Sequence, residues 1–369
     1  MHRQPRHLPA AAALASLLLL AFGCSAPSQG LQWGPVAYPP EPEEPRYYYE
    51  RTLIGTADAQ STSDEDTLRK ILTGVSGKSN IPFAKPFDIA VHQGRVFISD
   101  TIANIVFALD IPGQKSFQVG NKGDEGDLGN PLGISVDGEG KLYVVDSRAL
   151  RIAVYDRDGN YLTAFGGKET LDRPSGIVVN RDGSRAYVID VGGVRSEKHH
   201  IQVFDPRNGA LLHTIGSRGK GDGELNLPRD VALAPDGTLW VTDGGNFRVE
   251  GFTAEGEFLR TWGRPGLQFG DFSRPKGIAT DREGNVLAVD AGFGNFQIFD
   301  PEGQLLLFIG RRSEQNGPGV FMLPAGIDVD EDGRIYVVDQ FFRKVDIFRP
   351  ASLPPEAGFL AGHPVEATP

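Results

Sequence analysis

The sequence predicts an all-β fold, a six-bladed β-propeller of four-stranded antiparallel blades. Three observations predict it: one phrase recurs six times, each copy contains short apolar runs, and turn residues separate the runs. The 369 residues include 47 glycines and 26 prolines without a strict three-residue period, which excludes collagen and favours turn-rich β structure. Hydrophobic residues make up 40% and charged residues 23%, which excludes a polytopic membrane protein and a mostly disordered chain.

The first 23 residues are predicted to be a signal peptide. Arg3 and Arg6 provide positive charge at the start, and residues 10–23 form an apolar run without a charge. That run is too short for a membrane span and fits a secretory signal. It ends at Cys24, the single cysteine, so neither an intrachain disulfide nor a thiolate zinc cluster is expected.

Cys24 is the expected lipidation site. The segment Leu-Ala-Phe-Gly-Cys-Ser resembles a bacterial lipoprotein cleavage box, although Ala21 and Phe22 depart from its usual residues. The alternative is an ordinary signal peptide with an incidental cysteine. By the same resemblance, Ser25 in place of aspartate favours the outer membrane over the inner one. We therefore expect an outer-membrane lipoprotein that faces the periplasm or the cell surface.

The charge of the chain limits its partners. The formal net charge is −11, whereas nucleic-acid binding needs clustered cations, so no nucleic-acid partner is expected. An acidic body is repelled by anionic lipid, so the acyl chain is expected to supply the tether. Residues 24–46 are rich in proline and glutamate and are expected to form an extended linker outside the core. Residues 350–369 are expected to form a proline-rich tail.

Residues 47–349 form a sixfold repeat. Each copy runs from a proline through two apolar runs to an aspartate, followed by a third run, a turn and a fourth run. Short runs rich in Val, Ile, Leu and aromatic residues are typical of strands, and four strands in each such unit are typical of a propeller blade. The six phrases span residues 86–100, 131–146, 174–190, 228–243, 275–290 and 324–339.

The last blade is predicted to be completed by the start of the repeat region. The sixth copy has no fourth run after Phe348, and residues 47–55 have the fourth-run pattern. A ring of blades has no open edge only if the first segment completes the last blade. We therefore predict that residues 48–54 form the outermost strand of the sixth blade and close the ring.

The fourth copy contains the most complete motif. Residues 219–233 follow the pattern Gly-x-Gly-x-Gly-x-x-x-x-Pro-x-x-Val-Ala-Leu, and Asp243, Asn246, Arg248 and Val249 follow. This pattern resembles the NHL repeat, and the resemblance covers about residues 47–349. It implies a six-bladed propeller but no single function, because NHL propellers include protein-binding scaffolds, sensor ectodomains, RNA binders and a few lyases.

Chain direction defines a top face, where the first strand of each blade starts and the second ends. Propeller ligands usually bind there. Two interpretations are open for the aspartates that end each phrase. They could form a carboxylate ring that binds a cation, or each could form an Asx turn, which we favour. Some could also pair with a basic residue five positions later, as in Asp243/Arg248 and Asp339/Lys344. These aspartates are Asp100, Asp146, Asp190, Asp243, Asp290 and Asp339.

Two blades depart from the repeat at the second residue after the proline. Four blades have glycine there, whereas blades one and four have Asp88 and Asp230. These carboxylates are expected to face each other across the channel mouth, with Arg229 and Lys276 nearby. A divalent cation or a cationic ligand between them is one hypothesis. The alternative is that each carboxylate caps its own strand or pairs with Arg229 or Lys276.

The third blade has an enlarged loop over residues 191–200. It carries Arg195 and His200 as ligand-binding candidates, and His199 directly precedes His200. Adjacent residues on an extended strand point to opposite faces, so both histidines cannot easily bind one ion. Propeller lyases that cleave hydroxyglycine peptides use three histidines from three blades, and the corresponding positions here hold apolar residues. A zinc lyase is therefore disfavoured, and His200 is interpreted as a substitute for an arginine.

Aromatic residues on the top face suggest a partner surface. Phe341 and Phe342 follow the aspartate of blade six, and Phe293 and Phe296 follow that of blade five. One member of each pair is expected to pack into its blade, and exposed members would form an apolar patch of the kind that marks partner surfaces. The leading hypothesis is an envelope-anchored scaffold that binds a protein or ligand through its top face.

The alternative is an enzyme. It would be a metal-dependent hydrolase or lyase with its site at the channel mouth. No Ser-His-Asp order, P-loop or dinucleotide fingerprint is present, so no catalytic residue is assigned and no cofactor is expected apart from that possible divalent cation.

Overall fold

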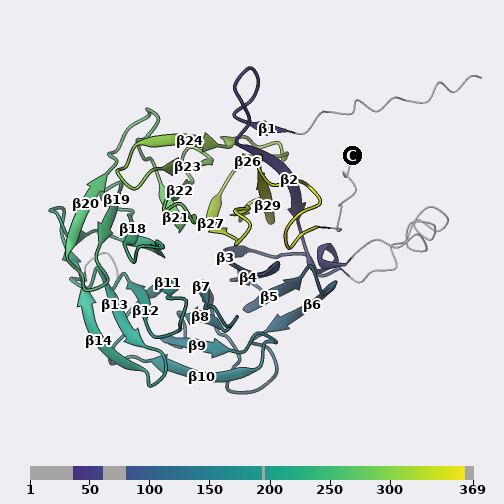
Figure 1. The fold of residues 1–369 in the computed structure, drawn as a ribbon. Helices are drawn as coiled ribbons and strands as arrows, with labels where there is room; N and C mark the ends of the chain where they lie inside the picture. The colour runs from purple at the N-terminus through teal and green to yellow at the C-terminus, as the bar shows by residue number, and fades with distance from the viewer. Residues whose placement is uncertain (1–35, 61–79, 193–195, 362–369) are drawn as a thin grey trace, which may run out of the picture. The chain divides into compact units, whose positions relative to one another are not determined.

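The protein is an all-β ring of six sheets, which confirms the predicted fold class. The computed structural model describes residues 36–60, 80–192 and 196–361, which belong to one compact unit that starts at Val36. Each sheet is a blade with four antiparallel strands arranged in chain order from the axis outward, except in the sixth blade (Figure 1). The strands are short, and turns of the expected kind connect them.

The first three blades are formed by strands β3 to β14. Blade one consists of β3 (Pro86–His92), β4 (Arg95–Asp100), β5 (Ile105–Asp110) and β6 (Lys115–Val119). Blade two consists of β7 (Pro131–Val136), β8 (Leu142–Asp146), β9 (Arg151–Tyr155) and β10 (Tyr161–Gly166). Blade three consists of β11 (Pro174–Val179), β12 (Ala186–Asp190), β13 (His200–Asp205) and β14 (Ala210–Ile215).

The other three blades include the N-terminal strands. Blade four consists of β17 (Pro228–Leu233), β18 (Leu239–Asp243), β19 (Arg248–Phe252) and β20 (Phe258–Trp262). Blade five consists of β21 (Pro275–Thr280), β22 (Val286–Asp290), β23 (Asn295–Phe299) and β24 (Leu305–Ile309). Blade six consists of β27 (Pro324–Val329), β28 (Ile335–Asp339), β29 (Lys344–Pro350), β2 (Tyr47–Leu53) and β1 (Ala37–Tyr38).

Small elements lie between the blades. β15 (Ser217–Arg218) pairs in parallel with β16 (Glu224–Leu225), and β25 (Arg311–Arg312) pairs in parallel with β26 (Val320–Phe321). A short 3₁₀ helix, η1 (Thr56–Ala59), follows β2. No helix in the described ranges is long and apolar enough to cross a membrane.

The core of the described unit lies in six apolar clusters, one at each seam between neighbouring blades. Because each blade packs on both faces, strands such as β4 and β5 are buried along their whole length and read as nearly continuous apolar runs. At the seam of blades six and one, Val338 packs with Ile98 and Phe107. Burial of a side chain of this size contributes about 1.5–3 kcal/mol.

Strand β2 lies beside β29, the last strand of the chain. The two pair antiparallel, with Tyr49 opposite Phe348 and Leu53 opposite Val345. The strand spans Tyr47–Leu53 rather than residues 48–54, and it is not outermost, because β1 pairs with its free edge. We predict that β2 keeps the ring closed, so that its deletion should open the sixth blade.

Two segments expected to lie outside the core contact it instead. Tyr38, within the predicted linker, stacks edge-on against Phe348 with 5.5 Å between ring centroids. Leu360, within the predicted tail, is 1% exposed in the cluster between blades six and one. In each segment one large side chain packs on the core. The burial of its apolar surface stabilises this contact, although the surrounding prolines favour an extended chain.

Candidate functional site

The six aspartates that end the repeat phrases are structural. Each is fully buried, and each accepts backbone N–H bonds from residues just before the proline of its own blade. Asp190, for example, accepts from Asp172 at 2.9 Å and from Arg173 at 2.6 Å. These bonds fix the start of every first strand, so the carboxylates are occupied by the fold and do not form a cation-binding ring.

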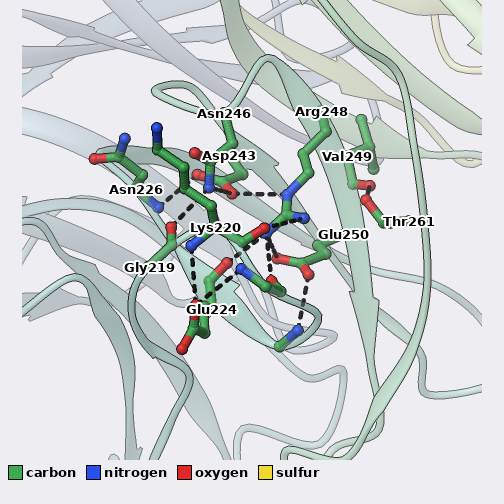
Figure 2. Close-up of polar contacts among 12 residues, drawn as sticks. Gly219, Lys220, Glu224, Asn226, Asp243, Asn246, Arg248, Val249, Glu250 and Thr261 are labelled. Carbon is green, nitrogen blue, oxygen red and sulfur yellow. Dashed lines mark hydrogen bonds and ion pairs between the residues drawn. The ribbon is translucent and has the colours of Figure 1, made fainter.

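The NHL-like motif of blade four has the same role (Figure 2). Asp243 accepts from Asn246 Nδ2 at 2.6 Å and from Arg248 Nε at 3.0 Å. Arg248 Nη2 donates to the carbonyl of Glu224 at 2.6 Å and to Glu250 Oε2 at 3.2 Å. Burial raises the pKa of Glu250 to about 7. The motif thus ties the glycine-rich loop before β17 to the blade.

The expected pairing of Asp339 with Lys344 does not form. Lys344 Nζ instead donates to Asp346 Oδ2 at 2.7 Å and to the carbonyl of Gly317 at 2.9 Å. Asp346 also accepts from Thr52 Oγ1 at 2.6 Å. Asp346 is buried and lies two residues further on the same face of β29, so a nearby cation compensates the cost of burying its charge. It also accepts from the N–H of Gly319 at 3.2 Å.

A pocket of about 370 Å³ opens at the top-face mouth of the channel. All six first strands have a register shift between the proline and the third residue after it, so one extra residue is inserted there. A bulge of this kind redirects side chains. The two residues after each proline consequently line the pocket: Phe87 and Asp88, Leu132 and Gly133, Ser175 and Gly176, Arg229 and Asp230, Lys276 and Gly277, and Ala325 and Gly326.

Glycine in four blades is explained by close approach of the first strands. A Cβ on Gly277 would lie 2.4 Å from the carbonyl oxygen of Ala325, and one on Gly133 would lie 2.5 Å from that of Ser175. No real Cβ makes such contacts, so a side chain at either position would force neighbouring backbones apart. The floor of the pocket is therefore largely backbone.

Asp88 and Asp230 join their blades to the next ones. Asp88 Oδ2 accepts from the N–H of Ile134 at 2.9 Å, and Asp230 Oδ2 accepts from that of Ile278 at 3.2 Å. Within the described residues, neither forms an ion pair with Arg229 or Lys276. The other half of that alternative, a cap on the aspartate's own strand, agrees with the backbone hydrogen bonds from Ile89 to Asp88 and from Val231 to Asp230. Both line the same pocket, as expected, but their carboxylates are engaged by backbone.

A hydroxyl accompanies each of these aspartates. Ser99 Oγ accepts from the N–H of Asp88 and donates to the carbonyl of Leu132 at 2.7 Å. Thr242 Oγ1 likewise accepts from Asp230 and donates to the carbonyl of Lys276 at 2.6 Å. The other four blades have Val or Ile at this position. The sequence therefore contained a signal for the structural role: the aspartate and the hydroxyl are substituted together.

The electrostatics below the mouth disfavour ionised carboxylates. Burial raises the pKa of Asp88 to about 7, and burial followed by repulsion from Asp88 raises the pKa of Asp230 well above its usual range. Asp328, which sequence reasoning missed, lies deeper in the channel and accepts from the N–H of Val91 at 2.7 Å. Burial raises its pKa to about 8. Within the described residues, no three His, Cys, Asp or Glu side chains are grouped to hold a metal.

The cations that line the pocket come from three neighbouring blades. We call Arg173, Arg229 and Lys276, from blades three to five, the cationic arc. Burial, then the charges of Arg274 and Arg229, lower the pKa of Lys276 to about 8, while burial lowers the pKa of Arg229. None of these three side chains has a hydrogen bond or ion pair within the described part of the chain. Arg173 was not recognised from the sequence.

The remaining candidates within the described residues do not line this pocket. Arg195 falls outside the described residues. His200 is half-buried, with its Nε2 3.3 Å from Gln202 Nε2, and burial lowers its pKa. His199 is buried, and its Nδ1 accepts from the N–H of Leu227 at 3.2 Å, so the adjacent histidines do differ in environment.

The prediction that one phenylalanine of each pair packs into its blade holds for blade five. Phe296 is fully buried, whereas Phe293 is half-buried. Phe341 is 56% exposed and contacts the half-buried Phe342 edge-on at 5.1 Å. Phe342 lies over Lys344 Nζ at 5.7 Å. Only Phe341 therefore presents most of its ring to solvent, and none of the four lines the pocket.

Comparisons with known proteins identify the repeat and the fold. Residues 225–252 match the NHL repeat. A stretch of 94 residues is 31% identical to the E3 ubiquitin-protein ligase NHLRC1 of Rattus norvegicus, but it covers only 26% of this chain and 22% of that protein. The chain therefore spans about a fifth of the length of this curated relative.

Solved structures share the architecture. A gluconolactonase from Xanthomonas campestris superposes with a TM-score of 0.54 and 18% identity, covering 83% of this chain and 99% of the other. Virginiamycin B lyase from Staphylococcus aureus superposes with a TM-score of 0.52 and 14% identity, covering 72% and 95%. At these identities the likeness shows the fold alone.

Proposed function

We propose that this six-bladed propeller with an NHL repeat is a binding module that takes a small ligand in the top-face pocket. The observation that carries the proposal is a pocket of about 370 Å³ to which every blade contributes the two residues after its proline. Its volume lies within the range of small-molecule sites. Its walls combine apolar side chains with unpaired charged ones, the combination that gives such sites both affinity and orientation.

The second part of the proposal is location at a bacterial envelope. It is supported by the signal-like residues 1–23 and by Cys24, which lie outside the described residues. Metabolic labelling with a palmitate analogue tests it in a double-membrane bacterium. Label on the wild type that is lost in Cys24→Ala, together with outer-membrane fractionation, supports the anchor. Unlabelled, fully soluble wild type rejects it.

A protein partner at the envelope is proposed on a separate observation, the exposure of Phe341. An apolar ring of this size at a top-face turn is typical of an interaction anchor. Capture of a defined envelope protein by the wild type and loss of capture by Phe341→Ser would support it. Phe359→Ser, at an exposed ring in the C-terminal segment, is the matched control.

Obstruction of the pocket tests the ligand-binding proposal. Ser175 lines the pocket, and its hydroxyl makes only a 3.5 Å contact to the carbonyl of Arg229, so Ser175→Trp fills the mouth at small structural cost. Ser217→Trp, at an exposed position outside the pocket, is the control. In a thermal-shift screen of small metabolites, ligands that stabilise the wild type and the control should fail with Ser175→Trp.

Equal stabilisation of all three proteins by every ligand would place binding elsewhere and reject the proposal. Elemental analysis addresses the enzymatic alternative. A stoichiometric divalent ion in the purified wild type that is lost in both Asp88→Ala and Asp230→Ala would support a metal-dependent hydrolase or lyase instead.

A further inference from the structure

We infer that the ligand of the top-face pocket is an amphipathic organic anion whose charged group contacts blades three to five and whose apolar part contacts blades six, one and two. This inference rests on the proposed ligand-binding function and specifies its substrate class. It is carried by the distribution of side chains around the pocket rather than by any single residue.

The residues directly after the six prolines divide the mouth of the pocket into two chemically different halves. The residue directly after the proline is Phe87 in blade one, Leu132 in blade two and Ala325 in blade six, and we call these three the apolar arc. In blades three, four and five the same position holds Ser175, Arg229 and Lys276. Successive blades are neighbours in the ring (Figure 1). Each set therefore comes from three consecutive blades, and the cationic arc belongs to the blades opposite those of the apolar arc.

The cationic arc lacks anionic partners in the described protein. The chain has a formal charge of −11, yet cations converge here: Lys276 is close enough to Arg274, Arg229 and Lys85 for their charges to lower its pKa. Like charges held together in a partly desolvated place repel one another. A bound anion would remove this repulsion, and guanidinium groups bind oxyanions such as carboxylates in bidentate fashion.

The aspartates of the floor do not supply that anion. Asp88 and Asp230 direct a carboxylate oxygen to the backbone of the next blade, and burial favours their neutral forms. A carboxylate on a ligand would thus approach the arc from solvent, above the floor. The apolar arc opposite would remove the remainder of the ligand from water, with a gain proportional to the area buried.

Three probes of nearly the same shape test the class of ligand. Phenylacetate is an anion, phenylacetamide is neutral and phenethylamine is a cation. Their dissociation constants are measured by ligand-observed NMR titration on the full mature chain. Phenylacetate should bind at least about tenfold more tightly than phenylacetamide, which is the effect of about 1.4 kcal/mol, and phenethylamine should bind most weakly.

Substitutions locate the charged group. Arg229→Gln and Lys276→Gln should each weaken phenylacetate binding about tenfold, within the range for a hydrogen bond to a charged group, and leave phenylacetamide unchanged. Lys168→Gln, at an exposed lysine outside the pocket, should change neither. Phe87→Ala should weaken the binding of phenylacetate and leave the binding of acetate unchanged, so that the ratio of their dissociation constants falls. The thermal midpoint of this variant checks that it folds.

The outcomes separate this inference from the proposed function. If phenylacetamide or phenethylamine binds as tightly as phenylacetate and Ser175→Trp abolishes the binding, the pocket binds ligands but not this class, and the inference is wrong. If phenylacetate binding is unaffected by Arg229→Gln and Lys276→Gln, the inference is also wrong. If no probe binds, the inference is wrong. If the probes bind but Ser175→Trp leaves binding intact, the inference is wrong and the pocket is not the binding site, so the proposed function is wrong as well.

Discussion

The Oδ1 atom of Asp190 accepts a hydrogen bond from the backbone N–H of Arg173 at 2.6 Å. A carboxylate buried at the end of a second strand thereby fixes the backbone of a cation at the mouth of the channel. The same arrangement links Asp290 to Arg274. The carboxylates of these two aspartates are thus engaged by backbone, and Asp190 positions a residue, Arg173, that lines the pocket.

Loss of this carboxylate should destabilise the protein. Asp190→Ala leaves the N–H groups of Asp172 and Arg173 without their acceptor, and each unsatisfied buried donor costs about 1–3 kcal/mol. We expect a fall of about 2–4 kcal/mol in the free energy of unfolding, measured by urea titration. Asp182→Ala, at an exposed turn of the same blade, is the control. A loss below about 0.5 kcal/mol would show that the bonds contribute little.

Removal of the N-terminal strand should open the sixth blade. Deletion of residues 47–55 exposes the edge of β29 and removes the bond from Thr52 Oγ1 to Asp346, and an exposed long edge promotes aggregation. We expect aggregation or loss of the cooperative unfolding transition, measured by light scattering and circular dichroism. Thr52→Val tests the single bond and should give a milder loss of stability. A soluble, cooperatively folded deletion variant would contradict the closing role.

Stability should fall as the pH rises from about 5 to 9. The pKa of Asp328 is raised to about 8 and that of Asp88 to about 7, above the values of the unfolded chain. Each group therefore adds stability that is complete below pH 4 and is lost as pH rises through its folded pKa. Asp328→Asn should flatten this profile in urea titrations at pH 5, 7 and 9. An unchanged slope would show that Asp328 is ionised in the folded protein without cost.

Binding of phenylacetate should weaken above pH 8. Lys276 has a pKa lowered to about 8, so its positive charge is lost as the pH rises through that value. Lys276→Arg retains the charge and should lose less affinity for phenylacetate between pH 7 and 9.5 than the wild type does. Asp88 and Asp230 line the same pocket, and their ionisation also opposes anion binding. Equal weakening in the wild type and in Lys276→Arg would assign the effect to these aspartates instead of Lys276.

The fold was predictable because its signals repeat. Six copies of one phrase determine the number of blades, and each buried aspartate occurs at the same place in its copy. The two core contacts that the sequence did not predict, those of Tyr38 and Leu360, are made from outside the repeat. Their packing depends on a gap in the core that no local pattern reveals.

The site was predictable only in part. The departures at Asp88 and Asp230 pointed to the channel mouth, where both line the pocket. Their hydrogen-bonding role was clear only with the hydroxyls of Ser99 and Thr242 beside them. The cationic and apolar arcs were not recognised, because their members are separated by whole blades along the chain. A comparison of the residue directly after each of the six prolines, taken in blade order, would have shown the apolar and the cationic half of the pocket.

The pairing of Tyr49 with Phe348 has a consequence for biogenesis. The N-terminal strand is synthesised, and in a secreted chain is exported, long before its partner emerges. A propeller of this design cannot finish assembly while the ribosome or translocation channel still holds its C-terminal end. Such distant pairing also slows folding, because the loop-closure entropy is lost before the contact forms.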